Sequence, residues 1–86
     1  MTLALRNEVT ITAVDDGAVL LDQRDGSYWQ LNRTGAASLR LLLEGTSPER
    51  TAALLTERHP ESADRALGDV RGLLDALRAA GLVVAS

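Results

Sequence analysis

The sequence predicts an α+β domain in which a three-stranded antiparallel sheet is followed by three helices. Up to Asn32 the residues alternate in polarity and are interrupted twice by Asp–Gly, whereas beyond Asn32 the leucines recur at helical spacing. A length of 86 residues allows one small domain, which we expect to span residues 1–86. A sheet with one apolar face needs a cover, which helices with leucine stripes can provide. The order of elements indicates a winged helix-turn-helix-like arrangement in which the wing comes first.

The three strands are expected at Glu8–Val14, Ala18–Gln23 and Ser27–Leu31, the first being rich in β-branched residues. Asp16–Gly17 and Asp25–Gly26 separate these strands. Asp–Gly between apolar runs is typical of a hairpin with a type I′ turn, because both central residues of that turn need a positive φ. The acidic residues of the two turns are expected to bond their own backbone. In such a meander the first and third strands are the edges.

The first two helices are recognised by their end residues. Asn32 or Thr34 can cap the first helix, and Gly45 stands where a left-handed residue ends a helix. Ser47–Glu49 opens the second helix with Ser as the cap, Pro at the first helical position and an acid in the first turn. We expect this helix to stop before Pro60.

The third helix begins near Ser62 or Asp64 and ends at Gly81, where Leu82 can complete a Schellman cap. Leu82–Val84 then forms a short extended tail. One buried stripe is predicted at steps of three and four residues, by Leu67, Val70, Leu74 and Leu77.

Gly68 and Gly72 lie inside the expected third helix, where each glycine costs about 1 kcal/mol relative to alanine. Two interpretations stay open. The glycines allow either close packing against a helix or strand, or a flat strip on which another chain can lie.

The residue types that most enzymes use are scarce. The chain has no Cys and no Lys, and its only histidine, His59, precedes Pro60 in the expected connection between two helices. A nucleophile needs a base that is held and oriented, and an exposed loop histidine does not provide one. Zinc sites need several His, Cys or converging carboxylates. We therefore expect a non-enzymatic protein without metal or cofactor.

Charge and composition also disfavour two classes of partner. The net charge is −3, and acidic and basic residues balance on the second and third helices, whereas a DNA reader needs a basic face. No apolar run approaches the roughly 18–20 residues of a membrane span. We expect neither nucleic acid nor membrane as a partner, and the lack of cysteine favours the cytoplasm. A winged-helix DNA-binding regulator stays the alternative from a different functional class.

Tyr28 and Trp29 are the only aromatic residues, and both lie on the expected third strand. Alternation places them on opposite faces, so that one should anchor the core while the other is exposed or lies in a groove. The segment Ser27–Leu31 contains no proline and no charge, although edge strands are usually protected by such residues. An open edge can accept an extended peptide as an additional strand.

The order and spacing of several segments resemble the PqqD-like proteins, which are precursor-peptide recognition elements for ribosomally made, modified peptides. The resemblance covers the chain from about Val9 to Val84 and rests on Asp25–Asn32, Thr34–Ala36, Leu41–Gly45, Asp69–Val70, Leu73–Leu74, Leu77 and Gly81–Val83. Within the family, a chain of this size most resembles the stand-alone leader-binding half of a split lasso-peptide B protein. A peptide chaperone of the PQQ pathway, which serves a radical SAM enzyme, is the nearest alternative.

The resemblance implies a leader peptide bound as an extra antiparallel strand on the third strand, in a cleft against the third helix. The leader would be extended and would present a Tyr and a Pro. A separate cysteine protease that removes the leader, and a cyclase, would receive the complex. Carried onto this sequence, the peptide-binding residues are Ser27, Tyr28, Trp29, Gln30, Leu31, Asp69, Val70, Leu73, Leu74, Leu77 and Arg78. Leu73 lies beside the core stripe, so we expect it on the pocket floor, and Asp69 and Arg78 on the rim.

Overall fold

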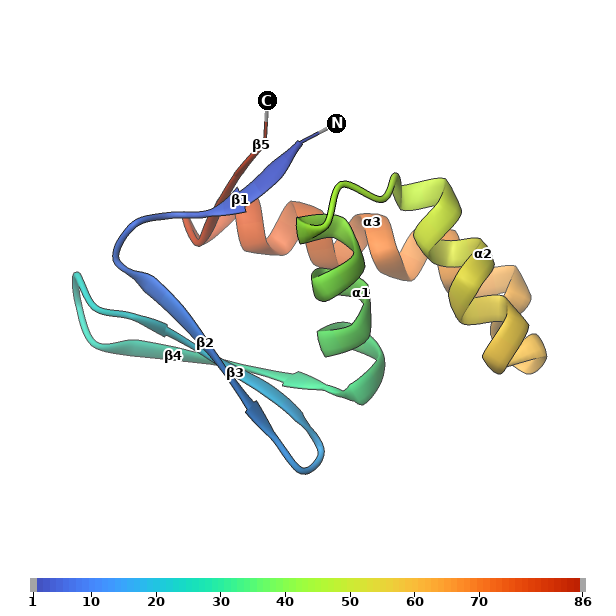
Figure 1. Cartoon of the computed structure of the whole chain (residues 1–86), viewed down its shortest axis with the longest axis horizontal. Helices are drawn as coiled ribbons and strands as arrows, with labels where there is room; N and C mark the ends of the chain where they lie inside the picture. Colours follow the sequence, from blue (N-terminus) through green and yellow to red (C-terminus); the bar gives the residue numbers. More distant parts are fainter. Residues whose placement is uncertain (1, 86) are drawn as a thin grey trace.

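The computed structural model describes residues 2–85, and the predicted strands and helices occur in the predicted order, with β1 and a 3₁₀ turn in addition. Figure 1 shows the meander on one side of α1 and α2 on the other, with α3 running past α1 from α2 toward β5. The α+β prediction of three antiparallel strands followed by three helices is confirmed. The elements are β1 Leu3–Leu5, β2 Val9–Val14, β3 Gly17–Asp22, β4 Ser27–Asn32, α1 Arg33–Leu43, α2 Pro48–Arg58, the 3₁₀ turn η1 Pro60–Ser62, α3 Ala63–Ala79 and β5 Val83–Ala85.

The meander has the strand order β2–β3–β4, so β2 and β4 are its edges, as predicted. The prediction of type I′ turns is wrong. Val14 pairs with Gly17, which leaves two aspartates as the first loop, and no described residue other than glycine has a positive φ. The second loop has four residues and closes through a 2.8 Å hydrogen bond from Gly26 N to Asp22 O. The Asp–Gly pairs therefore locate the hairpins but do not form their two central positions.

Gly17 is needed for a different reason, which is the close approach of β4. A Cβ built on Gly17 would lie 1.9 Å from the carbonyl oxygen of Leu31, and the φ of 150° is one that other residues rarely adopt. The glycine of the first Asp–Gly pair thus belongs to the strand pairing.

A second, two-stranded sheet is not predicted from the sequence. β1 pairs antiparallel with β5, with Leu3 opposite Ala85 and Leu5 opposite Val83. The expected extended tail Leu82–Val84 is confirmed at Val83 and Val84, whereas Leu82 lies in a bend, and the strand that pairs with β5 lies at the other end of the chain, as Figure 1 shows. A strand of three residues has too few positions to show a period, and the pairing depends on tertiary contact.

Local capping sets the ends of α1 and α2 as the sequence indicates. Asn32 Oδ1 accepts a 2.8 Å hydrogen bond from Gly35 N, which makes Asn32 the cap of α1. Ser47 Oγ accepts one of 3.1 Å from Arg50 N at the start of α2, whose last residue precedes His59 and Pro60. These bonds satisfy amide groups that a helix start leaves without a partner.

The end of α3 is a Schellman cap, as predicted. Leu82 N donates to Leu77 O at 3.0 Å, and Gly81 N donates to Arg78 O at 3.0 Å. The buried stripe of the helix differs at its first position, because Ala66 is buried and Leu67 only half-buried. The stripe therefore runs through Ala66, Val70, Leu74 and Leu77.

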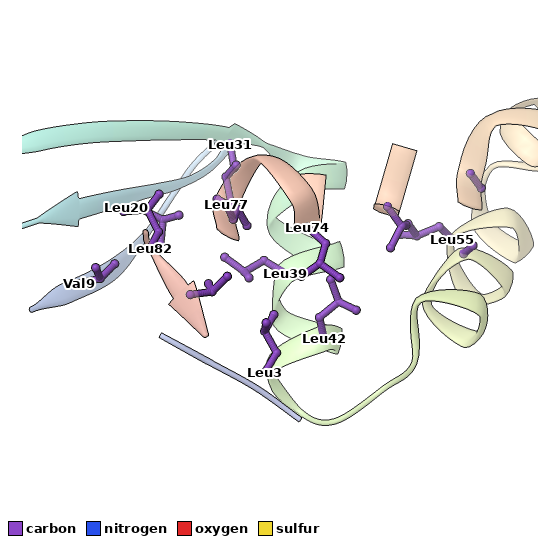
Figure 2. Packing of buried hydrophobic residues seen from close by; sticks show 14 residues of the cluster. Leu3, Val9, Leu20, Leu31, Leu39, Leu42, Leu55, Leu74, Leu77 and Leu82 are labelled. Atoms are coloured by element: carbon purple, nitrogen blue, oxygen red, sulfur yellow. The ribbon is translucent and has the colours of Figure 1, made fainter. Parts of the chain in front are cut away.

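The core lies where α1 meets the meander on one side and α3 on the other. Figure 2 shows leucines from the sheet, α1 and α3 converging in one cluster. The largest side chains with almost no exposure are Leu20, Leu39, Leu42, Leu77, Leu82 and Val70. α1 therefore lies between the meander and the other helices and contacts both. No helix in residues 2–85 is long and apolar enough to cross a bilayer.

Candidate functional site

A groove of about 510 Å³ lies between the end of β4, the start of α1 and the α2–α3 pair. β4 pairs with β3 along one edge only, so its other edge is without a strand partner in the described chain. The groove is lined by Gln30, Leu31, Asn32, Thr34, Gly35, Ser38, Leu55, His59, Ser62, Arg65, Ala66, Asp69, Val70 and Leu73.

β4 contributes its second half to the groove. Gln30 and Leu31 line it, followed by the cap residue Asn32. Trp29 is half-buried against the core, whereas Tyr28 is 71% exposed. The prediction that one aromatic anchors the core and the other is exposed is confirmed. Ser27 lies at the far end of β4, where its N and Oγ donate to Asp25 Oδ1 at 3.0 and 2.7 Å.

Of the six α3 residues expected to contact the peptide, three line the groove. Asp69, Val70 and Leu73 line the groove, and Leu73 is half-buried beside the core. Leu74 and Leu77 point into the core and do not reach the groove. The exposed Arg78, which lies near the end of the helix, does not line the groove either.

The rest of the lining comes from elements that the sequence reasoning did not connect with the site. Thr34, Gly35 and Ser38 belong to the first turns of α1, Leu55 belongs to the last turn of α2, and His59 is the residue that follows α2. His59 is exposed, as expected, but its place at the groove depends on the α2–α3 packing. Within α3, helical spacing could have predicted part of the lining, because Ala66, Val70 and Leu73 follow at steps of four and three residues and share one helix face.

The groove combines an apolar floor with a polar rim. Leu31, Leu55 and Val70 are buried aliphatic residues that border it. Arg65 and Asp69 stand on the rim one turn apart on α3. In residues 2–85 neither forms an ion pair, and Arg65 Nη2 reaches only Ser62 Oγ, at 3.4 Å. Such a floor and rim can hold apolar side chains of an extended chain and bond its polar groups.

The described residues offer no constellation for metal binding. No group of three His, Cys, Asp or Glu comes together in the part of the chain that the structure describes. His59 Nδ1 lies 3.5 Å from Glu61 Oε1, and both side chains are more than half exposed.

A buried charged group lies at the other end of β4. The side chain of Asp22 is 5% exposed and is held by Arg24, with Oδ1 2.9 Å from Nε and Oδ2 2.7 Å from Nη2. The side-chain hydrogen bond from Arg24 lowers the pKa of Asp22 below its ordinary value, against the desolvation that raises it. Arg24 Nη2 also donates to Gly81 O at 2.9 Å. This Asp22–Arg24–Gly81 contact joins the β3–β4 turn to the end of α3.

Gly68 and Gly72 do not serve close packing. A Cβ on either glycine would meet no atom within 4 Å, so the close-packing interpretation is wrong. Both residues are exposed on α3 and neither lines the groove.

One family model and two solved structures match this chain. The model of the family described as "Coenzyme PQQ synthesis protein D (PqqD)" matches residues 17–83. The solved structure of lasso peptide synthetase B1 complexed with the leader peptide is 36% identical with a TM-score of 0.89, covering 99% of this chain and all of the other. TbiB1 in complex with the TbiA(β) leader peptide is 27% identical with a TM-score of 0.82, covering 100% of this chain and 98% of the other. A search of curated proteins gave no match.

Proposed function

The chain belongs to the PqqD family, and from this membership we propose that it binds the leader region of a ribosomally synthesised precursor peptide in lasso-peptide maturation. The observation that carries the proposal is the unpaired edge of β4 beside a groove whose far wall is α3. The two similar structures are both described as complexes with a leader peptide.

The leader adds to β4 as an antiparallel strand. Main-chain hydrogen bonds to an open edge provide affinity with little dependence on sequence. Because β4 runs from Ser27 to Asn32, an antiparallel leader has its upstream end beside Asn32. The groove borders Gln30–Asn32, so the upstream residues of the leader enter it.

Specificity comes from side chains that alternate across the added strand. Those on the core side of the sheet meet Val70 and Leu73 on α3, which accept apolar anchors such as the Tyr and Pro that the family resemblance implies. Those on the outer side pass Tyr28, which is open to solvent. Ser27–Leu31 of β4 and Asp69, Val70 and Leu73 of α3 are the proposed contacts. Arg78 contacts only a leader that extends beyond the groove.

The chain presents the leader to other proteins rather than processing it. Its only histidine is exposed and the described residues hold no metal cluster, whereas removal of a leader and ring closure need catalytic groups. A separate cysteine protease and a cyclase supply these groups. Membership of the PqqD family also supports a second candidate, a peptide chaperone that serves a radical SAM enzyme.

A fluorescence-anisotropy titration tests leader binding, with the labelled leader of the precursor peptide encoded beside this gene as the probe. We expect saturable binding between micromolar and nanomolar, about 8–12 kcal/mol. A scrambled peptide of the same composition is the control. No saturation below about 100 μM would contradict the proposal for that peptide.

Backbone methylation tests strand addition separately from binding. In an antiparallel pair, amide groups of alternate residues point toward the neighbouring strand, so N-methylation along the leader should weaken binding at every second position. The methyl groups at the positions between should have little effect. Uniform effects along the leader would leave leader binding intact but contradict strand addition.

A further inference from the structure

Few backbone contacts join the two walls of the groove, β4 and α3, directly, although leucines of both elements share one core cluster. β3 and β4 pack extensively against α1, and α1 packs against α3, whereas neither β3 nor β4 packs extensively against α3. At one end, β4 continues directly into α1, whose first turn is fixed by the Asn32 cap. At the Ser27 end, β4 has no such covalent link to a helix. There the side chain of Arg24 contributes a contact between the β3–β4 turn and the end of α3.

The geometry points to Arg24 as a positioning residue that holds the Ser27 end of β4 at a fixed distance from α3 and so sets the width of the leader groove. This inference rests on the proposed function, since the leader is the ligand whose fit depends on that width. Arg24 itself does not line the groove.

The contact has the directionality that positioning requires. Two donors of the guanidinium meet both oxygens of Asp22 at 2.9 and 2.7 Å, and Asp22 Oδ1 also accepts Arg24 N at 3.1 Å. Charge-assisted pairs of this two-bond form fix orientation as well as distance. The remaining bond of Nη2, 2.9 Å long, is made to Gly81 O.

Asp22 and Gly81, which Arg24 joins, lie beside the ends of the elements that form the groove walls. Asp22 is the last residue of β3 and pairs with Ser27, the first residue of β4. Gly81 follows directly after the cap of α3. In residues 2–85 the bond from Arg24 to Gly81 is the only side-chain hydrogen bond between the β2–β4 meander with its turns and the end of α3. The space is close, because a Cβ on Gly81 would lie 3.3 Å from Arg24 Nη2.

Arg24→Gln removes the paired contact, and Arg71→Gln is its matched control. Arg71 Nη2 bonds Glu49 Oε2 at 2.6 Å, but this pair joins α2 to α3 and does not reach the meander. We expect leader binding to weaken at least about fivefold in Arg24→Gln and less than about twofold in Arg71→Gln, each ratio taken from anisotropy titrations. Arg24→Lys keeps the positive charge but not the planar pair of donors that meets both oxygens of Asp22, so its affinity for the leader should lie between those of wild type and Arg24→Gln. It also replaces Arg24→Gln should that variant fail to fold.

A measurement without peptide separates this inference from the proposed function. The chain has no cysteine, so Tyr28→Cys on β4 and Asp75→Cys on α3, both at exposed positions, can carry a pair of spin labels. Dipolar EPR should give a broader or longer distance distribution with Arg24→Gln and an unchanged one with Arg71→Gln.

The inference requires both weaker leader binding and an altered label distance distribution in Arg24→Gln. A wild-type distance distribution, or leader affinity within about twofold of wild type, would overturn it. If the wild-type protein bound no leader, the proposed function would fail. The label distances would then still decide whether Arg24 positions β4.

Discussion

Tyr28 and Trp29 are consecutive residues of β4 that lie on opposite faces of the sheet. Trp29 stands opposite the fully buried Leu20 and packs against the core, whereas Tyr28 stands opposite Leu21 and is 71% exposed. Since both residues belong to the proposed peptide-binding edge, their contributions to folding and to binding can be separated by substitution.

Trp29→Ala should lower the free energy of unfolding by about 2–4 kcal/mol, because a large side chain leaves a cavity beside Leu20. Tyr28→Ala should change it by less than about 0.5 kcal/mol, as at other exposed positions. Urea unfolding followed by circular dichroism measures both, since the fluorescence of Trp29 is lost in the first variant. Equal destabilisation by the two substitutions would contradict the opposite-face arrangement.

The hairpins and the helix ends are predictable from the sequence because each depends on residues close together in the chain. Asn32, Ser47 and Gly81 act on neighbouring amide and carbonyl groups, and alternation assigns Tyr28 and Trp29 to different faces. The β1–β5 pair and the geometry of the turns are not predictable in this way. The β1–β5 pair depends on contact between the two ends of the chain, and the need for glycine at position 17 comes from the close approach of Leu31 on β4.

Gly68→Ala and Gly72→Ala should each raise the free energy of unfolding by about 0.5–1 kcal/mol. Both glycines lie inside α3 with open space around the missing Cβ, so alanine removes backbone freedom from the unfolded chain without a clash. In a domain of this size, 1 kcal/mol raises Tm by about 4–8 °C. Thermal unfolding measures the shift.

Gly45→Ala is the control for these glycine substitutions. No atom lies near its missing Cβ either, but its φ is +97°, so alanine should lower the free energy of unfolding, by about 1–2 kcal/mol. A loss of stability in the α3 variants would show that the exposed strip is in contact with another part of the chain.

Thr51→Val should raise the free energy of unfolding by about 1 kcal/mol. Thr51 is fully buried in α2, and its Oγ1 has no hydrogen-bond partner in residues 2–85, so the hydroxyl is desolvated without compensation. Thr56→Val is the matched control, because Thr56 Oγ1 donates to Ala52 O at 2.9 Å in the same helix. The control should lose about 0.5–1.5 kcal/mol. A loss in both variants, measured by urea unfolding, would mean that Thr51 has a partner.

Protonation of Asp22 in acid should lower the free energy of unfolding. Its pKa in the folded protein is lowered from 3.8 by the hydrogen bonds from Arg24, so folding favours the ionised carboxylate. The contribution is therefore complete well above pH 3.8 and is lost as the pH falls through the lower folded value.

Asp22→Asn removes this dependence. The variant should be less stable than wild type at neutral pH, and the difference in Tm should shrink as the pH falls below 3.8. Asp75→Asn changes the same charge at an exposed position of α3 and is the control. A constant difference between Asp22→Asn and wild type at all pH values would contradict the assignment to the carboxylate.

The proposed site is only partly predictable from the sequence, for a physical reason. Gln30 and Leu31 follow from the open edge, and Leu73 follows from its place beside the core stripe. Ser38 and His59 reach the groove only because α1 and the end of α2 pack beside α3, which no local pattern specifies. Leu74 and Leu77 share the face of α3 that the core uses, and helix period alone does not separate floor from core.

Leu73→Glu should weaken leader binding at least about tenfold while the protein stays folded. Leu73 is half-buried and lines the groove, so a glutamate there places a charge without a partner against the bound peptide. Leu67→Glu is the matched control, since Leu67 lies on the same helix, is half-buried against the same core and does not line the groove. Both variants should lose similar stability in urea unfolding, but only Leu73→Glu should lose affinity in the anisotropy titration. Unfolding of Leu73→Glu alone, seen by circular dichroism, would assign Leu73 to the core. Equal loss of affinity in both variants would mean that the leader contacts α3 outside the groove.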